Sequence, residues 1–142
     1  MSNELIPDSD ITWLLLYTKS NAEAWTEVNL RNQGYVSLIP RVAARSGFRP
    51  LFPRYVFAGH SAQLSPRALA STSGVLYVVT CGDRPARVPC DVITEIRGRM
   101  NENGVVHIES KPAPDPLFAK RERERVHALV KLAQAGFRVK SA

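Results

Sequence analysis

The sequence has few of the residues that catalysis or metal binding requires. Its 142 residues include two cysteines and three histidines. Cys81 and Cys90 form no CxxC pair and have no histidine at the spacing of a zinc site, so we expect reduced thiols and no bound metal. No HExxH, GxSxG or glycine-rich phosphate loop occurs either. These absences predict that the protein is not an enzyme and uses no cofactor.

Long hydrophobic runs are also missing. The run at residues 13–17, WLLLY, is far shorter than the roughly 20 residues that cross a membrane, and it lacks the basic flank and cleavage site of a signal peptide. We therefore expect a cytoplasmic protein with no membrane association. A hydrophobic content of 44% in a chain of this length is sufficient for one compact domain and an appendage.

Acidic residues are absent from residues 28–82, although this segment contains six arginines, as many charges as the formal net charge of +6. Arginine pairs bidentately with phosphate and stacks on bases, so the segment indicates a polyanionic partner or an acidic protein surface. A solvated basic face explains the charge equally well. Residues 120–125, KRERER, alternate in sign and are typical of an exposed helix face.

The chain divides into four segments: a flexible leader at residues 1–10, a domain at 11–109, a proline-rich linker at 110–116 and a tail at 117–142. In the tail, apolar residues recur at helical spacing before Gly136, and they are Val126, Leu129, Val130 and Ala133. This spacing predicts a tail helix that begins near Asp115 and ends at Gly136.

The domain begins with a strand and a helix. The apolar and β-branched content of residues 11–18 predicts a buried strand. Ser20 and Glu23 form a capping box, which predicts a helix over residues 21–33 that stops at Gly34. One stripe of this helix, which we expect to face the core, consists of Ala22, Trp25 and Val28.

Three aromatic residues and two prolines gather at residues 50–57, PLFPRYVF, after a basic hairpin tip at residues 43–47. In a strand, alternation would place Leu51, Pro53, Tyr55 and Phe57 on one face and Phe52, Arg54 and Val56 on the other. Proline donates no ladder hydrogen bond, so we expect this strand to start at an edge or in a loop. One face would pack in the core and the other would contact a partner.

Further elements follow the aromatic run. Ser65 and Pro66 predict the start of a short helix. The β-branched content of residues 75–80 predicts a strand, and the apolar spacing of residues 90–100 predicts a helix. Residues 105–108 are a candidate for a last short strand.

This order of elements resembles the N-terminal domain of NusG-type transcription elongation factors and, within that family, the RfaH-like paralogues. The likeness covers about residues 12–100 and depends on four motifs: WLLLYTK at 13–19, PLFPRYVF at 50–57, SGV at 73–75 and PARVP at 85–89. It implies an α/β fold, an α+β sandwich of ferredoxin-like type, in which helices flank a mostly antiparallel sheet and a helical tail follows.

The resemblance also implies a partner. It implies binding to the clamp helices of the largest subunit of bacterial RNA polymerase, and suppression of pausing or termination. The apolar positions that match here are Tyr17, Leu51, Phe52, Pro53, Tyr55 and Phe57. Phe52, Pro53 and Tyr55 are the expected contacts, because aromatic residues beside prolines serve as interface anchors. Alternatively, Tyr17, Leu51 and Phe57 fill the core.

RfaH-like proteins hold the displaced non-template DNA strand on a second surface. The matching positions are Lys19, Gln33 and Arg67, with Asn29 and Asn32 nearby, and their side chains suit phosphate or base edges. The threonine-rich stretch of RfaH reads Ser65-Pro66-Arg67-Ala68 here, so one arginine replaces a set of hydroxyl groups. We expect Arg67 to contribute affinity for phosphate without base discrimination.

The tail departs further from the family, whose members usually end in a small β-barrel, the KOW domain. About two dozen residues are too few for a barrel, so we expect a monomer without ribosome coupling. The tail is either a helix or a remnant of the barrel, and the helical spacing favours the helix. By analogy with RfaH, it would cover Phe52 and Tyr55 through four apolar residues: Val126, Leu129, Val130 and Phe137.

A stand-alone RNA-binding module of ferredoxin-like shape is the alternative interpretation. In it the basic segment would follow RNA, and Phe52, Tyr55 and Phe57 would stack on bases. No RNP1-like pattern supports this alternative.

Overall fold

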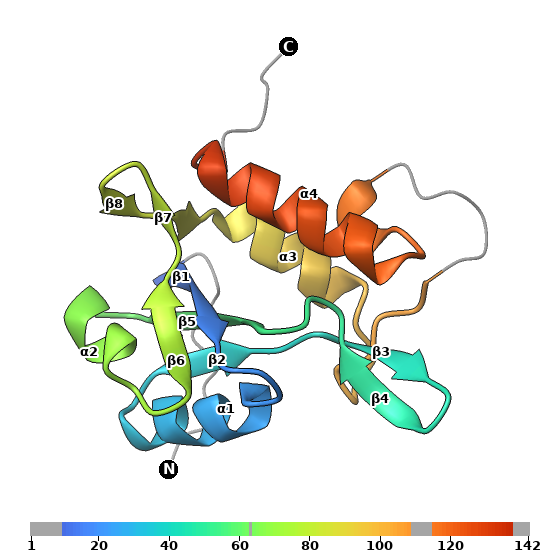
Figure 1. The fold of residues 1–142 in the computed structure, drawn as a ribbon, viewed down its shortest axis with the longest axis horizontal. Coiled ribbons are helices and arrows are strands. Elements are labelled where there is room, and N and C mark those ends of the chain that lie inside the picture. The colour runs from blue at the N-terminus through green and yellow to red at the C-terminus, as the bar shows by residue number, and fades with distance from the viewer. Residues whose placement is uncertain (1–9, 63, 109–114, 138–142) are drawn as a thin grey trace.

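The structure is a computed structural model that describes residues 10–62, 64–108 and 115–137. Its centre is an antiparallel sheet in which β2, β5, β1 and β6 lie side by side in that order (Figure 1). A fifth strand, β9, also pairs with β1. The five strands are β1 Thr12–Thr18, β2 Val36–Leu38, β5 Tyr55–His60, β6 Val75–Val78 and β9 Arg87–Val88. The strand predicted at residues 11–18 is thus the central strand β1.

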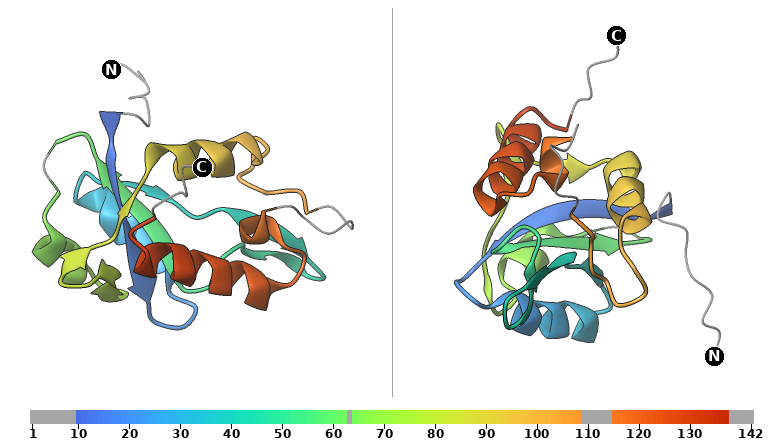
Figure 2. Two further views of the ribbon diagram at one scale, coloured as in Figure 1. Left: turned by 90° about the horizontal axis from the view of Figure 1, so that it is seen from above. Right: turned by 90° about the vertical axis from the view of Figure 1, so that its right-hand side faces the viewer.

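Helices cover both faces of this sheet (Figures 1 and 2). The helices α1 Glu23–Asn32 and α2 Pro66–Ala70 lie on one face, and α3 Cys90–Gly98 and α4 Glu122–Gln134 lie on the other. Two apolar clusters follow this division. One contains Leu14 and Leu16 of β1 with Leu30 of α1, and the other contains Leu15 of β1 with Ile93 of α3. The α/β sandwich with a mostly antiparallel sheet and a C-terminal helix is therefore confirmed.

Two small hairpins extend from the sheet. β3 Arg41–Ala44 pairs with β4 Gly47–Pro50, and the tip predicted at residues 43–47 turns between these two strands. β7 Thr80–Cys81 pairs with β8 Arg84–Pro85.

Two predicted strands differ from the structure. The strand expected at residues 75–80 is interrupted at Val79, whose amide donates to the carbonyl of Leu15, so β6 and β7 belong to different sheets. The strand expected at residues 105–108 is reduced to single bridges at Val105 and Val106.

The predicted start of α1 was wrong. The helix begins at Glu23 after Ala22, no side chain caps it, and Asn21 has a positive φ of 58°. The Glu23 carboxylate, expected to reach back to Ser20, instead accepts the backbone amide of Arg54 at 2.8 Å. A contact that is distant in sequence therefore replaces the local capping box.

The predicted core face of α1 was also wrong. Thr26 and Leu30 are fully buried, whereas Trp25 is 56% exposed and Val28 is 49% exposed. The Trp25 indole N–H donates to the Ser73 hydroxyl at 3.0 Å, which holds the ring at the surface. The helix is thus turned so that a different stripe packs on the sheet.

The aromatic run is a turn followed by a strand, not a continuous strand. Pro50 ends β4, residues 51–54 form a turn, and β5 begins at Tyr55. Arg54 has a φ of 74°, which a strand residue does not adopt. The alternation predicted for residues 51–54 therefore fails, and Leu51 and Phe52 are both buried.

The short helix α2 begins as predicted. The Ser65 side chain accepts the amide of Ala68, and Pro66 occupies the first helical position. The tail helix begins later than predicted. The Asp115 side chain accepts the amide of Leu117 but caps only a short 3₁₀ turn, η2 Pro116–Phe118, and α4 begins at Glu122.

The position of α1 depends on Gly74, which yields a stability prediction. Gly74 has a φ of 99°, and a Cβ atom there would collide with the Thr26 hydroxyl. Gly34 has a similar φ of 89° with open space around it. We expect Gly34→Ala to lower the free energy of unfolding by about 1–2 kcal/mol through backbone strain alone. Gly74→Ala should lower the free energy of unfolding, measured with urea, by clearly more. Equal losses for the two substitutions would contradict the close approach of Gly74 to Thr26.

Candidate interaction surfaces

The six residues predicted to face the polymerase lie together on the sheet face that α3 and α4 cover. We name them the aromatic patch: Tyr17, Leu51, Phe52, Pro53, Tyr55 and Phe57. Leu51 and Phe57 are fully buried, Phe52 is 1% exposed and Tyr55 is 9% exposed. Tyr17 and Pro53 are half-buried. In this conformation most of the patch is therefore inaccessible to a partner.

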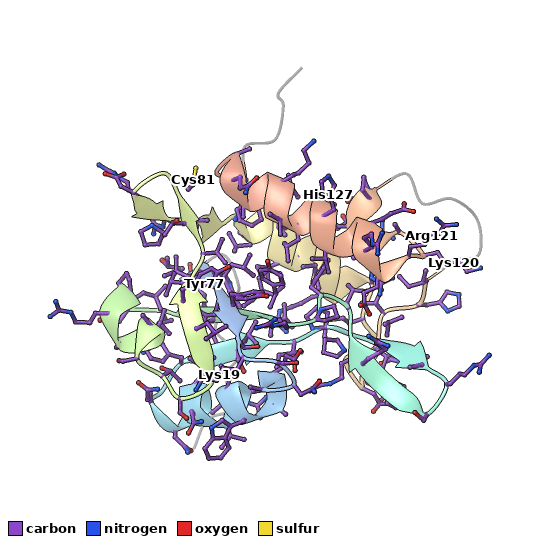
Figure 3. All side chains as sticks on the ribbon, in the orientation of Figure 1. Lys19, Tyr77, Cys81, Lys120, Arg121 and His127 are labelled. Atoms are coloured by element: carbon purple, nitrogen blue, oxygen red, sulfur yellow. The ribbon has the colours of Figure 1, made fainter. Side chains whose placement is uncertain are left out.

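A row of tyrosines crosses the sheet at the open end of the patch. Tyr17 lies between Tyr55 and Tyr77, with ring centroids 5.0 Å apart on each side. The guanidinium of Arg54 lies 4.5 Å from the centre of the Tyr17 ring. Burial, and then the neighbouring tyrosines, raise the pKa of Tyr55, whereas Arg54 lowers it. Tyr77 is 49% exposed, so the row leads from the covered patch to the surface (Figure 3).

Sequence reasoning missed Tyr77. Its place beside Tyr17 depends on the register between β1 and β6, which shifts between Tyr17 and Thr18. No local pattern in residues 75–80 indicates that register.

The tail helix α4 lies over the patch. Leu129, Ala133 and Phe137 are buried in the same apolar cluster as Leu51 and Phe52. Val126 and Val130 are half-buried and, with Tyr17, Pro53 and Tyr55, line a cleft of about 510 Å³ between the tail helix and the patch. The structure thus brings all four predicted tail residues to the patch, two of them in the core and two at its margin.

Arg125 joins the tail to the turn of the aromatic run. Its side chain is 3% exposed, and its Nε donates to the Leu51 carbonyl at 3.0 Å. Its Nη1 donates to the carbonyls of Ala119 and Lys120 at 2.8 and 2.9 Å. Burial lowers the pKa of this guanidinium. At the surface, Arg49 of β4 forms an ion pair with Glu122 at 2.7 Å.

Sequence reasoning placed Arg125 on an exposed face, because it belongs to an alternating charged run. A signal was nevertheless present. Arg125 precedes Leu129 and Ala133 by four and eight residues, so it belongs to the stripe that packs on the patch. A charged residue on an apolar stripe indicates a buried polar contact.

A second surface lies on the opposite side of the sheet, where α1 meets the turn between α2 and β6. We name it the polar strip: Trp25 and Asn29 of α1, Gln33 directly after it, and Thr72 and Ser73 of the turn. Asn29 Nδ2 donates to the carbonyls of Trp25 and Ser73 at 2.9 and 3.4 Å. Gln33 Nε2 donates to the Asn29 carbonyl at 3.1 Å and to Thr72 Oγ1 at 2.9 Å.

Three of the five predicted nucleic-acid contacts gather at this strip. Asn29 and Gln33 belong to it, and the backbone amide of Lys19 donates to the Gly74 carbonyl at 2.9 Å (Figure 3). Asn32 and Arg67 are exposed on α1 and α2. Sequence reasoning missed Trp25, because its spacing fits a core stripe as well as a surface one.

Three of the six arginines of residues 28–82 contact other side chains. Arg31 pairs with Glu27 at 3.4 Å, and Arg49 and Arg54 make the tail and tyrosine contacts described above. No group of three or more acidic, histidine or cysteine side chains in the described residues is placed to hold a metal ion. Among the same residues, no helix is long and apolar enough to cross a bilayer.

The family model of transcription termination factor NusG matches residues 11–97. The chain belongs to the NusG family. The matched residues extend from β1 into α3, so they include the aromatic patch and the polar strip, whereas the tail lies outside them.

A solved structure shares the fold of this NusG family member. It describes a domain interaction in Thermotoga maritima NusG, at 21% sequence identity and a TM-score of 0.50. The alignment covers 72% of this chain and 64% of that chain, so the likeness spans less than two thirds of the Thermotoga protein. No curated protein matches the sequence.

The buried arginine yields a prediction for the tail. Arg125→Met keeps the length of the side chain but leaves the Leu51 and Ala119 carbonyls without their donor, so we expect a loss of about 2–3 kcal/mol in the free energy of unfolding. Amide exchange in residues 122–137 should accelerate. Arg123→Met, at an exposed position of the same helix, is the control and should change stability by less than about 0.5 kcal/mol. Equal effects of the two substitutions would refute the role of Arg125.

Proposed function

We propose that this NusG family member regulates transcript elongation by binding RNA polymerase through the aromatic patch, and that it catalyses no reaction of its own. The partner would be the clamp helices of the largest subunit, and binding would suppress pausing or termination. The protein would act as a cytoplasmic monomer and contact the non-template DNA strand through the polar strip. The observation that carries the proposal is the position of the aromatic patch, which lies within the residues matched to the family.

The contact between the patch and α4 supports a helical partner. The patch already packs against an amphipathic helix, whose apolar residues enter the cluster that contains Leu51 and Phe52. A surface that accepts one amphipathic helix has the shape and polarity to accept another. The clamp helices would therefore replace α4.

The tail then acts as a competitor for the patch. With α4 in place, Phe52 and Phe57 are buried and only the tyrosine row is partly open. Only molecules with the tail displaced would bind fully, so the apparent dissociation constant would equal the intrinsic one divided by the fraction of open molecules. The tail would thereby set the affinity for polymerase.

The stand-alone RNA-binding alternative is less consistent with the structure. It requires Phe52 and Phe57 to stack on bases, and both rings are buried beneath the helices of that face. A nucleic-acid contact on the opposite side of the sheet, at the polar strip, does not require these rings.

A disulfide that closes the tail tests this function. A Cβ atom at Gly136 would lie 3.4 Å from Cys81 Sγ, and the Cys81 thiol already donates to the Gln134 carbonyl at 3.3 Å (Figure 3). We expect Gly136→Cys, in a Cys90→Ser background, to form a disulfide with Cys81 when oxidised. The φ of 70° at Gly136 strains a side chain there, and this strain is the same in the oxidised and reduced protein. Oxidation should abolish co-purification with core RNA polymerase, and reduction should restore it.

The parent Cys90→Ser chain, oxidised and reduced in the same way, is the control and should bind equally in both states. A chain that ends after residue 114 should bind more tightly than the full chain. Equal binding by the oxidised and reduced Gly136→Cys variant would rule out that the tail masks the patch. If neither the reduced chain nor the truncated chain bound polymerase, the proposed partner would be wrong.

A further inference from the structure

Trp25 exposes its ring in a fixed orientation. Its side chain is 56% exposed, and its only polar atom, the indole nitrogen, is satisfied by the Ser73 hydroxyl at 3.0 Å. The part of the side chain left for a ligand is therefore the aromatic ring itself. A ring held in this way loses little conformational freedom on binding, as a stacking surface requires.

The two carboxamides beside Trp25 have used all their donor hydrogens. Each amide nitrogen carries two hydrogens. Asn29 Nδ2 donates to two carbonyls, and Gln33 Nε2 donates to a carbonyl and to Thr72 Oγ1. The Thr72 hydroxyl in turn donates to the Ala68 carbonyl at 3.0 Å. For an incoming ligand, Asn29 and Gln33 therefore present oxygen atoms that only accept hydrogen bonds.

The charges around the strip suit an anionic ligand. Lys19 is exposed at the Gly74 end, where its backbone is tied to the turn. The two acids of α1 are engaged elsewhere: Glu23 accepts the Arg54 amide, and Glu27 accepts from Ser37 and pairs with Arg31. A cation at one end of the strip, an exposed aromatic ring and acids that are hydrogen-bonded elsewhere are features that suit single-stranded nucleic acid.

We propose that the polar strip binds one unpaired nucleobase, which stacks on Trp25 and donates its exocyclic amino group to the oxygens of Asn29 and Gln33. The site then favours cytosine, adenine or guanine over thymine or uracil, whose Watson–Crick edge has one N–H between two carbonyl acceptors. This inference rests on the proposed DNA contact and adds to it a stacking residue and a base preference.

Binding of short oligo(dC) and oligo(dU) strands to the full chain tests the proposal. Cytosine and uracil have the same ring size, so the two strands differ mainly in the hydrogen-bonding edge. By fluorescence anisotropy at low salt, oligo(dC) should bind about tenfold more tightly than oligo(dU). Trp25→Ala should weaken the binding of both strands about tenfold, because stacking does not depend on the edge. Trp25→Phe should recover part of this loss.

Matched substitutions separate stacking from base recognition. The double variant Asn29→Ala, Gln33→Ala should bind oligo(dC) only as well as oligo(dU), while Trp25 still stacks. Val28→Ala removes another exposed apolar side chain of α1 outside the strip and should leave both affinities unchanged. Circular dichroism would verify that each variant is folded.

Each failure has a distinct meaning. Equal binding of the two strands, with no loss in Trp25→Ala, would overturn the base site and leave a phosphate contact through Lys19 as the DNA interaction. The absence of any binding at low salt would overturn both the base site and the proposed DNA contact. The polymerase contact is tested separately by the disulfide lock.

Discussion

Strand β1 is apolar on both faces, and the remaining architecture follows from the need to cover both of them. Leu14 and Leu16 face α1 and α2, whereas Trp13 and Leu15 face α3 and α4. On this second face, α3 lies near Trp13, whose ring is 5.7 Å from the Arg97 guanidinium. The other end of that face carries the aromatic patch and is left to the tail. The sheet thus creates the surface that we propose binds polymerase and also the requirement for a helix to cover it.

Polar contacts at the start of α4 hold the tail in one position on the patch. Arg125 is buried and donates to three backbone carbonyls, while the carboxylate of Glu122 is paired with Arg49. Desolvation of a guanidinium costs free energy, and the hydrogen bonds to these carbonyls offset that cost only while the tail is docked. When the tail leaves, Arg125 regains its hydration while a competing helix replaces the apolar contacts of Leu129. The bonds of Arg125 therefore specify where the tail docks.

Hydrophobic periodicity predicted most elements, because the alternation in β1 and the spacing in α3 and α4 are local properties of the chain. The failures all involve contacts distant in sequence. The buried face of α1 is set by Thr26 against Gly74 and by Glu23 at the Arg54 amide, so Trp25 could not be assigned from its spacing. The position of Arg125 likewise depends on a carbonyl 74 residues away. The family motifs supplied all six positions of the aromatic patch, but only Asn29 and Gln33 among the five residues of the polar strip.

The two surfaces meet in the backbone at the end of β1 and otherwise lie on opposite sides of the sheet. The Thr18 amide donates to the Arg54 carbonyl on the patch side, and the Lys19 amide donates to the Gly74 carbonyl on the strip side. The side-chain bonds that build the polar strip are made within α1, α2 and the turn before β6, and none of them involves the tail. Displacement of α4 would therefore open the patch without disturbing the strip. Polymerase binding would depend on the state of the tail, whereas single-stranded DNA would find the same site in both states.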